Sequence, residues 1–412
     1  MALVMDILRS SHISAVRFLD GGGTRTRSCK IRRFNVRSNL PFPKQNAKYH
    51  KELEAAIDVV QNACRLCVQV KSSLFSTDGK VLEKNDQTPV TVADFGVQAL
   101  ISLELSKLFP SIPLVAEEDS AFLRSRNLVD TVLDALVTAE ASSTSKTLTQ
   151  DDVLKAIDRG GKDAFVFGSK PATYWVLDPI DGTRGFLKDN KALYVVGLAL
   201  VVEGEIVIGI MGCPNWQEDL SEKSSAETEE GREALSGSGI MMIAHKGYGT
   251  WTKRLNSKPK SSAVWTRCFV DAFNMVHKAR FCIPESQTWE SLPLSSTFNA
   301  TSNANDVGSS QILILATCCG SLCKYLMVAS GRASVFIQRE KQKTTIKAWD
   351  HAVGMICIHE AGGKVTDWEG IEIDLAADQP SRRIIFPSGG ILATNGNLHN
   401  QILQIISQTS RV

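Results

Sequence analysis

The chain has 412 residues, of which 43% are apolar and 22% charged, and its formal net charge is +2. This composition is that of a soluble globular protein, and the length suits two domains. The charge balance argues against a broad basic surface for nucleic acid. The longest apolar stretch, Ala192–Val202, is too short to span a bilayer.

The first 48 residues differ in composition from the rest of the chain. They hold seven Arg and three Lys but only two acids. In Met1–Leu19, apolar residues alternate with Arg9 and Arg17 and form no uninterrupted apolar core. This pattern resembles an organellar transit peptide and not a secretory signal. The Arg spacing favours a mitochondrial over a chloroplast destination, and a disordered basic tail is the alternative.

The ten cysteines are scattered along the chain. Cys64 and Cys67 form a lone C-x-x-C that lacks the second pair of a zinc site. The cysteines therefore predict free thiols in a reducing compartment and no zinc.

Two acidic motifs follow a first helix. Apolar residues recur with a helical period over Tyr49–Phe75, which predicts that helix. Thr91 and Asp94 then have the spacing of a capping box before a second helix. Leu114–Ala116 predicts a short strand, and Glu117 and two further acids follow it. A helix cap or a solvated loop explains each of these acids when it is considered alone.

The central motif is Asp178-Pro-Ile-Asp181-Gly-Thr183, which follows two helical patterns over 129–139 and 149–157. An apolar run at Tyr174–Leu177 predicts a buried strand that ends at Pro179. Two carboxylates at the end of one strand repel each other unless hard cations lie between them. Mg²⁺ takes such oxygen ligands, so the motif predicts a magnesium site. A solvated, Asp-rich turn is the alternative.

The rest of the chain predicts a second α/β unit. Strand patterns over 192–199, 200–202 and 205–211, with a hairpin turn at Glu203-Gly204, complete the first unit. We place a boundary near residue 235, which gives an N-terminal α+β domain over 49–235 and a C-terminal α/β domain over 236–412. A strand, a helix and a strand are expected at Gln311–Thr317, Leu322–Ala329 and Ala333–Ile337.

Asp350 lies where a later helix is expected to begin, and Gly362-Gly363 ends that helix before another strand. A cap or a dipole partner is the ordinary role of an acid at a helix start. The alternation of helices and strands along the chain predicts the α/β class.

Four stretches together carry a family resemblance. They are Asp86-Gln-Thr-Pro-Val-Thr-Val-Ala-Asp94, Val115-Ala-Glu-Glu118, Trp175-Val-Leu-Asp-Pro-Ile-Asp-Gly-Thr183, and Trp349-Asp350 with the later Glu360-Ala-Gly-Gly363. In this order they resemble the magnesium-dependent, lithium-sensitive phosphatase superfamily that includes inositol monophosphatase and 3′(2′),5′-bisphosphate nucleotidase. The resemblance covers residues 50–405 and implies an αβαβα sandwich of two domains.

The connection between the second and third motifs resembles one branch of this superfamily. Glu118 and Asp178 are separated by a long link, which is short in the inositol monophosphatase branch, and Cys213-Pro-Asn follows. Both features resemble the bisphosphate nucleotidase branch. That branch removes the 3′-phosphate from adenosine 3′,5′-bisphosphate (PAP) to give AMP, and from its sulfated relative PAPS, in sulfur metabolism.

The resemblance implies a role for each matched residue. Glu117, Asp178, Asp181, Asp350 and the Ile180 carbonyl would bind two or three Mg²⁺ ions. Asp94, paired with the Thr183 hydroxyl, would activate the attacking water. Gly182, Thr183 and Asp350 would contact the substrate, a small nucleotide.

The substrate contacts match less completely. Gly320-Ser321-Leu-Cys-Lys324-Tyr325 corresponds to the family's Asp-Ser-Gln-Ala-Lys-Tyr, which makes Ser321 and Lys324 candidate phosphate ligands. The Arg of a family strand, Tyr-Leu-Arg-Leu-Pro, is lost here or displaced by one position to Arg339. A displaced residue points to the other face of the strand unless the strand bulges. Two alternatives therefore stay open: an inositol phosphate or polyphosphate phosphatase, and a nucleotide-binding regulator with little turnover.

Overall fold

The computed structural model describes residues 40–76, 82–83, 89–140, 148–188, 192–217, 239–255, 264–303, 311–315, 320–340 and 345–409. They belong to a single compact unit, Ser38–Val412. Residues 1–39 of the expected transit peptide and the expected boundary near residue 235 lie outside the described residues. Residues 40–48, which the composition assigns to the same leader, instead pack against the body. The Phe42 ring, for example, lies 4.7 Å from the ring of Tyr248.

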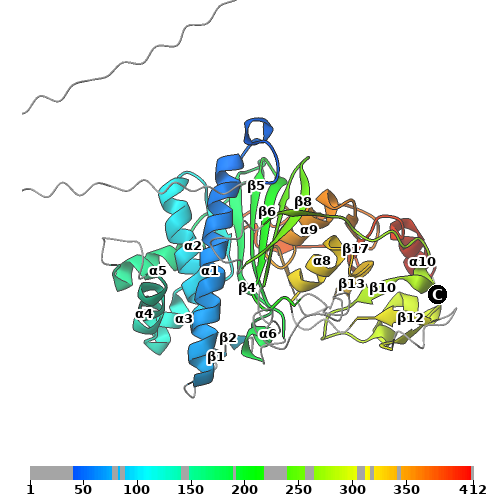
Figure 1. Cartoon of the computed structure of the whole chain (residues 1–412), viewed down its shortest axis with the longest axis horizontal. Coiled ribbons are helices and arrows are strands. Elements are labelled where there is room, and N and C mark those ends of the chain that lie inside the picture. The colour runs from blue at the N-terminus through cyan, green and yellow to red at the C-terminus, as the bar shows by residue number, and fades with distance from the viewer. Residues whose placement is uncertain are drawn as a thin grey trace, which may run out of the picture. The chain divides into compact units, whose positions relative to one another are not determined.

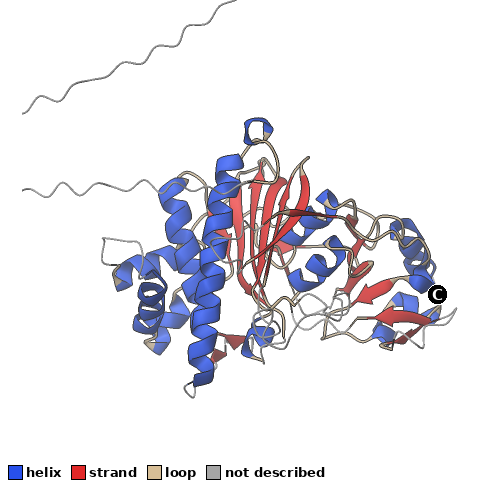
Figure 2. Ribbon diagram, viewed as in Figure 1, coloured by secondary structure: helices blue, strands red, loops and turns tan. Residues whose placement is uncertain are grey.

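Helices and strands alternate along the described chain (Figure 2). The helices are α1 (His50–Ser76), α2 (Val92–Leu108), α3 (Ala121–Arg126), α4 (Val129–Glu140), α5 (Gln150–Asp158), α6 (Thr183–Leu187), α8 (Leu322–Ala329), α9 (Ala352–Glu360) and α10 (His399–Thr409). The strands are β1 (Leu82–Glu83), β2 (Pro89–Val90), β3 (Leu114–Ala116), β4 (Tyr174–Asp181), β5 (Val195–Val202), β6 (Glu205–Cys213), β7 (Ile240–His245), β8 (Gly249–Arg254), β9 (Thr266–Cys268), β10 (Arg280–Cys282), β11 (Asn299–Thr301), β12 (Gln311–Ile314), β13 (Val335–Arg339), β14 (Ile346–Lys347), β15 (Lys364–Asp367), β16 (Ile384–Ile385) and β17 (Gly390–Thr394).

Two large sheets and three helical layers make up most of the unit, together with the small two-stranded sheets β1-β2 and β14-β16 (Figure 1). The larger sheet has the strand order β3-β4-β5-β6-β7-β8-β9, and the smaller one β11-β12-β10-β13-β17-β15. Helices α1 and α2 cover one face of the larger sheet, and α8 and α9 lie between the two sheets. Helix α10 packs on the far side of the smaller sheet. The αβαβα order that the family resemblance implies is therefore confirmed.

The central strands of the larger sheet, β4 to β7, are buried on both faces. Along β4, Trp175 and Leu177 enter the core beneath α1 and α2, whereas Tyr174 and Val176 enter the core shared with α8 and α9. Side chains alternate between the faces of a strand, so a doubly covered strand is a continuous apolar run. Each fully buried large apolar side chain stabilises the fold by about 1.5–3 kcal/mol.

The structure corrects the bounds of three predicted strands. Strand β4 does not end at Pro179 but continues to Asp181, through a register shift described below. The two strands expected before the hairpin are one strand, β5. The hairpin turn itself is confirmed, because Glu203 and Gly204 have φ angles of 51° and 85°. Within the described residues, no helix combines the length and the apolar character needed to cross a membrane.

Candidate active site

Two parallel strands bring the first pair of acids together. Strand β3 pairs with β4 so that Ala116 lies opposite Leu177. Glu117 and Asp178 directly follow these partners, at the same edge of the sheet. The carboxyl ends of parallel strands are the usual place for a ligand site in an α/β fold.

A bulge in β4 brings the second carboxylate to the same side. Residues three apart in a regular strand point to opposite faces. Here Asp178 pairs with Gly197 and Asp181 with Val195, so three steps along β4 match only two along β5. The extra residue restores the alternation. Carboxylate oxygens of Asp178, Asp181 and Asp350, which follows β14, consequently all lie within 4.8 Å of one another.

This cluster is strongly unfavourable without a counter-charge. Asp178 is 2% exposed, and no group of the described residues forms a hydrogen bond with its Oδ1 atom. Burial, and then the carboxylates of Glu117, Asp181 and Asp350, raise the pKa of Asp178 well above its usual value. Burial, and then the carboxylates of Asp181 and Glu117, raise the pKa of Asp350 well above its usual value, although a hydrogen bond with Asp178 and the charge of Lys347 oppose the shift. Oxygen donors alone, one of them unpaired and buried, fit a hard divalent cation.

Asp181 also caps helix α8. Its Oδ1 accepts from the Ser321 amide at 3.0 Å, and its Oδ2 accepts from the Leu322 amide at 2.7 Å. Burial raises the pKa of the Asp181 carboxyl to about 6, although Lys324 and the two amides oppose the shift. Gly320 has a φ of 70°, and a Cβ atom there would lie 2.2 Å from Asp181 Oδ2. The close approach of the chain therefore requires glycine at this position.

Asp94 uses its two oxygens for different purposes. Oδ2 accepts from the amide and the hydroxyl of Thr91, at 2.8 and 2.6 Å, and completes the expected capping box of α2. Oδ1 accepts from the Thr183 hydroxyl at 3.3 Å. That hydroxyl also lies 3.2 Å from the Ile180 carbonyl oxygen. The cap and the predicted pairing with Thr183 are thus both present.

The acids line a pocket of about 310 Å³. Ser321, Lys324, Gly182, Thr183 and Arg184 also line it. Lys324 is 2% exposed, and its Nζ donates to the Gly320 carbonyl at 2.7 Å. All the predicted site residues described so far therefore surround one pocket or adjoin it.

Arg339 does not line this pocket. Its guanidinium donates to the Ser291 carbonyl at 2.7 Å, and its backbone is bound on both sides by the Gln287 amide group. The preceding residue, Gln338, lines the pocket instead. Val335 and Ile337 enter the core between the smaller sheet and α10, whereas Phe336 enters the core shared with α8 and α9. Strand alternation therefore excludes Arg339 and selects Gln338, which the motif comparison alone missed.

Comparisons with known proteins agree with this architecture. The profile of the inositol monophosphatase family matches residues 48–411. The chain belongs to the inositol monophosphatase family. It is 63% identical, over 97% of its length and 98% of the relative's, to a protein of Arabidopsis thaliana provisionally named a mitochondrial 3′(2′),5′-bisphosphate nucleotidase.

Two further comparisons extend this result. Another Arabidopsis thaliana protein, named 3′,5′-bisphosphate nucleotidase 2, is 34% identical over 88% of this chain and 97% of its own. Among solved structures, an IMPase of Thermotoga maritima superposes with a TM-score of 0.50, at 19% identity, over 88% of this chain and 98% of its own. The structural likeness shows the fold that this inositol monophosphatase family member shares.

A buried glutamine of this family member fixes the loop that carries Glu117. Gln98, fully buried one turn after Asp94, donates from Nε2 to the Glu118 carbonyl at 2.7 Å and to the Ile157 carbonyl at 2.9 Å. Its Oε1 accepts from the Glu118 amide at 2.9 Å. The sequence analysis missed this role, and the signal that could have found it is a polar residue among the apolar residues of the expected second helix.

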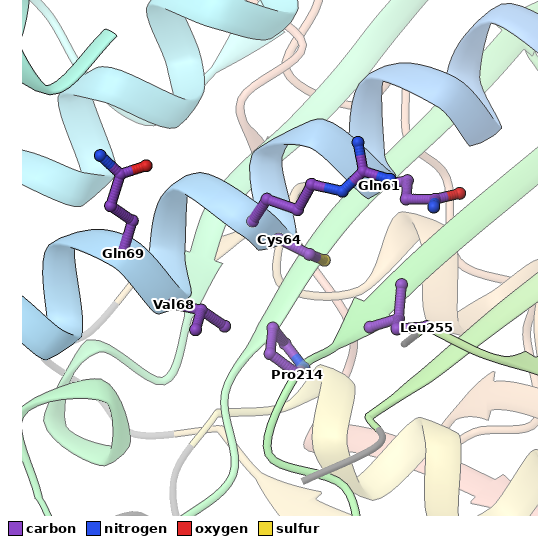
Figure 3. A pocket seen from close by; sticks show the side chains of 7 residues that line it. Gln61, Cys64, Val68, Gln69, Pro214 and Leu255 are labelled. Atoms are coloured by element: carbon purple, nitrogen blue, oxygen red, sulfur yellow. The ribbon is translucent and has the colours of Figure 1, made fainter. Parts of the chain in front are cut away.

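A second pocket lies on helix α1, away from the acids. Figure 3 shows Cys64 and Val68 on the side of α1 toward Pro214 and Leu255, and Gln61 and Gln69 of α1 also line this pocket. Its volume is about 200 Å³, and none of the acids of the family's active site lines it. Burial raises the pKa of the Cys64 thiol far above its usual value, so this cysteine is an inert core residue. Of these two pockets, the acidic one therefore carries the carboxylates of the candidate site.

Proposed function

We propose that the protein is a Mg²⁺-dependent 3′(2′),5′-bisphosphate nucleotidase. It removes the 3′-phosphate from PAP to give AMP and phosphate, with PAPS as a second substrate. The observation that carries the proposal is the convergence of Asp178, Asp181 and Asp350 around a buried, unpaired carboxylate oxygen in a pocket. The names of the two Arabidopsis thaliana relatives support the nucleotide substrate.

Glu117, Asp178, Asp181, Asp350 and the Ile180 carbonyl would hold two or three Mg²⁺ ions. Bound Mg²⁺ supplies positive charge for the scissile phosphate and lowers the pKa of a water molecule. Asp178, Ile180 and Asp181 belong to β4, and Glu117 directly follows β3, whereas Asp350 follows β14. The site is therefore complete only when the larger sheet and the segment between β14 and α9 are both in place.

The protein's own groups perform the proton transfer. Asp94 Oδ1, together with the Thr183 hydroxyl, orients the attacking water and takes its proton. The Thr183 hydroxyl has a single proton, and both Asp94 and the Ile180 carbonyl are in reach of it. When the Ile180 carbonyl is engaged as a ligand, that proton points to Asp94, which fixes the catalytic pair.

The substrate would occupy the rest of the pocket that the acids line. Arg184 and Lys324 provide cations for its phosphates, and the Ser321 hydroxyl and the backbone at Gly182 provide hydrogen bonds. Gln338 supplies an amide in the same pocket. Hydrolysis of inositol phosphates is the second candidate function, because this position of β13 carries a neutral amide and not the guanidinium of Arg339.

The deciding experiment compares substrates with the full-length protein in Mg²⁺. Phosphate release is measured from PAP, inositol 1-phosphate and inositol 1,4-bisphosphate. Release mainly from PAP supports the nucleotidase, whereas release mainly from the inositol phosphates replaces it with the second candidate. No release from any of them, together with tight PAP binding, would establish a regulator instead. Micromolar-to-millimolar Li⁺ is added as a separate series, in which the nucleotidase is expected to be inhibited.

We propose further that the protein resides in mitochondria. The Arg-spaced start of the sequence and the mitochondrial designation of the 63% identical relative support this location. A fluorescent protein fused to the C-terminus of the full chain tests it. Co-localisation with a mitochondrial marker is expected, and plastid fluorescence would assign the chloroplast.

A further inference from the structure

Arg383 lies on the ribbon that delivers Asp350. It directly precedes β16, which pairs with β14 so that Ile384 lies opposite Lys347. The Arg383 carbonyl also accepts from the Ala348 amide at 2.9 Å. Only one residue then separates this hydrogen bond from Asp350. The backbone at Arg383 and the backbone that carries Asp350 are therefore held together by hydrogen bonds.

The side chain of Arg383 reaches the other half of the metal site. Its Nη1 donates to the Gly160 carbonyl at 3.1 Å. Its Nη2 donates to the Ala116 carbonyl and, at 3.4 Å, to the Glu117 carbonyl. Ala116 is the last residue of β3, and Glu117 follows it. One guanidinium thus holds the strand end from which the Glu117 carboxylate projects.

The same guanidinium contacts the residue before Asp350. It lies 4.9 Å from the centre of the Trp349 ring, a cation–π distance. Trp349 is 5% exposed, so this contact is shielded from water. Arg383 therefore touches, on one side, the backbone of Glu117 and, on the other, the neighbour of Asp350.

We propose that Arg383 is a positioning residue that sets the distance between Glu117 and Asp350 and thereby the affinity of the site for Mg²⁺. The inference rests on the proposed metal-dependent function. A guanidinium suits the task because its planar fork binds several carbonyls in fixed directions and stacks on an indole ring. A lysine ammonium keeps the charge but not this geometry.

Residues that orient metal ligands typically change metal affinity by about 10- to 100-fold when they are replaced. We expect Arg383→Met to weaken Mg²⁺ binding within that range. The primary readout is isothermal titration of Mg²⁺ into the metal-free full-length protein. The second is the dependence of Tm on Mg²⁺ concentration, which reports the same affinity without substrate.

Arg159→Met is the matched control. Arg159 is likewise half-buried, and it donates to two backbone carbonyls, Ser102 and Ile112, each at 3.0 Å. Neither carbonyl belongs to a metal ligand. This variant should lose stability in the metal-free state and keep wild-type Mg²⁺ affinity. Equal Mg²⁺ affinities in Arg383→Met and Arg159→Met would overturn the proposal.

Two further outcomes remain distinguishable. If Arg383→Met does not fold, Arg383→Lys carries the test, and it must bind Mg²⁺ more weakly than Arg159→Met for the proposal to stand. Wild-type protein that binds Mg²⁺ but releases no phosphate from PAP would refute the proposed function alone. The role of Arg383 would then still be decided by the Mg²⁺ titrations.

Discussion

The two oxygens of the Asp94 carboxylate have different partners, which leads to a prediction that a second capping box can control. A second capping box, Thr149 and Asp152 at the start of α5, has the same geometry but lies outside the pocket. We expect Asp94→Asn to reduce kcat by about 10²- to 10⁴-fold, since a positioned base is lost. Asp94→Asn and the control variant Asp152→Asn should each also lose about 1 kcal/mol of stability, because each weakens a helix cap.

The measurement is steady-state kinetics with PAP, together with the free energy of unfolding in urea. Asp152→Asn should lose only stability and keep its kcat. An Asp94→Asn protein with wild-type turnover would reduce Asp94 to a helix cap.

The buried carboxylates predict how stability depends on pH. The pKa of Asp181 is about 6 in the folded protein, against an ordinary value of 3.8. Between these two values the unfolded chain releases its proton first, so the metal-free protein loses stability as pH rises. One such proton contributes about 1.4 kcal/mol per pH unit. Burial also raises the pKa values of Asp178 and Asp350, so both carboxyls add to this loss in the same direction.

The ionised carboxylates are the proposed Mg²⁺ ligands, so the rise in Tm that Mg²⁺ produces should grow steadily from pH 4 to pH 7. Taking the difference between curves with EDTA and with Mg²⁺ removes the contribution of groups far from the site, such as His399. A Tm difference that is independent of pH would contradict the buried acidic cluster.

At the scale of secondary-structure elements, the start of α8 depends on one glycine. Gly320→Ala places a methyl group against Asp181 Oδ2 in addition to straining the backbone. Gly247 has a similar φ of 81°, but a Cβ atom there meets nothing within 4 Å. Both alanines should cost about 1–2 kcal/mol of backbone strain. Only Gly320→Ala should also lose Mg²⁺-dependent activity and Mg²⁺ binding.

Unfolding in urea and Mg²⁺ titration separate the two effects. Gly247→Ala serves as the control for strain. If Gly320→Ala retained wild-type Mg²⁺ affinity, Asp181 would tolerate displacement and the cap by α8 would be unimportant for the metal site.

The same elements show what the sequence could predict. The bounds of α1 and α8 follow from apolar periodicity, because a helix with one buried face repeats that pattern locally. The metal ligands are predictable because Asp178 and Asp181 lie within four residues of each other. Even so, the bulge that unites them contradicts the simple strand rule, which ended β4 at Pro179.

Other parts of the site depend on contacts that are distant in the sequence. Gln338, and not Arg339, lines the pocket because of the register of β13, which a shift of one residue reverses. Arg383 meets Ala116 across 267 positions of the chain. Neither local propensity nor spacing carries such information, so these roles required the folded structure.

At the scale of the whole molecule, the proposed metal site joins the larger sheet to the start of α9, in the helical layer between the sheets. Asp178 and Asp181 belong to the larger sheet, whereas Asp350 lies next to the helical layer between the sheets. Without cations, the repulsion among these three carboxylates destabilises the folded arrangement that brings them together. We therefore expect EDTA to lower the Tm of the full-length protein and added Mg²⁺ to restore it. A ligand at 100 times its Kd stabilises the folded state by about 2.7 kcal/mol.

Asp178→Asn tests whether this effect arises at the acidic cluster. The variant removes one buried charge, so its metal-free form should be more stable than the metal-free wild type at pH 7. It should also lose both PAP hydrolysis and the Mg²⁺-dependent rise in Tm, because the most buried ligand is gone. Tm is measured by calorimetry with and without Mg²⁺. A variant that is destabilised without metal and still stabilised by Mg²⁺ would place the cation elsewhere in the molecule.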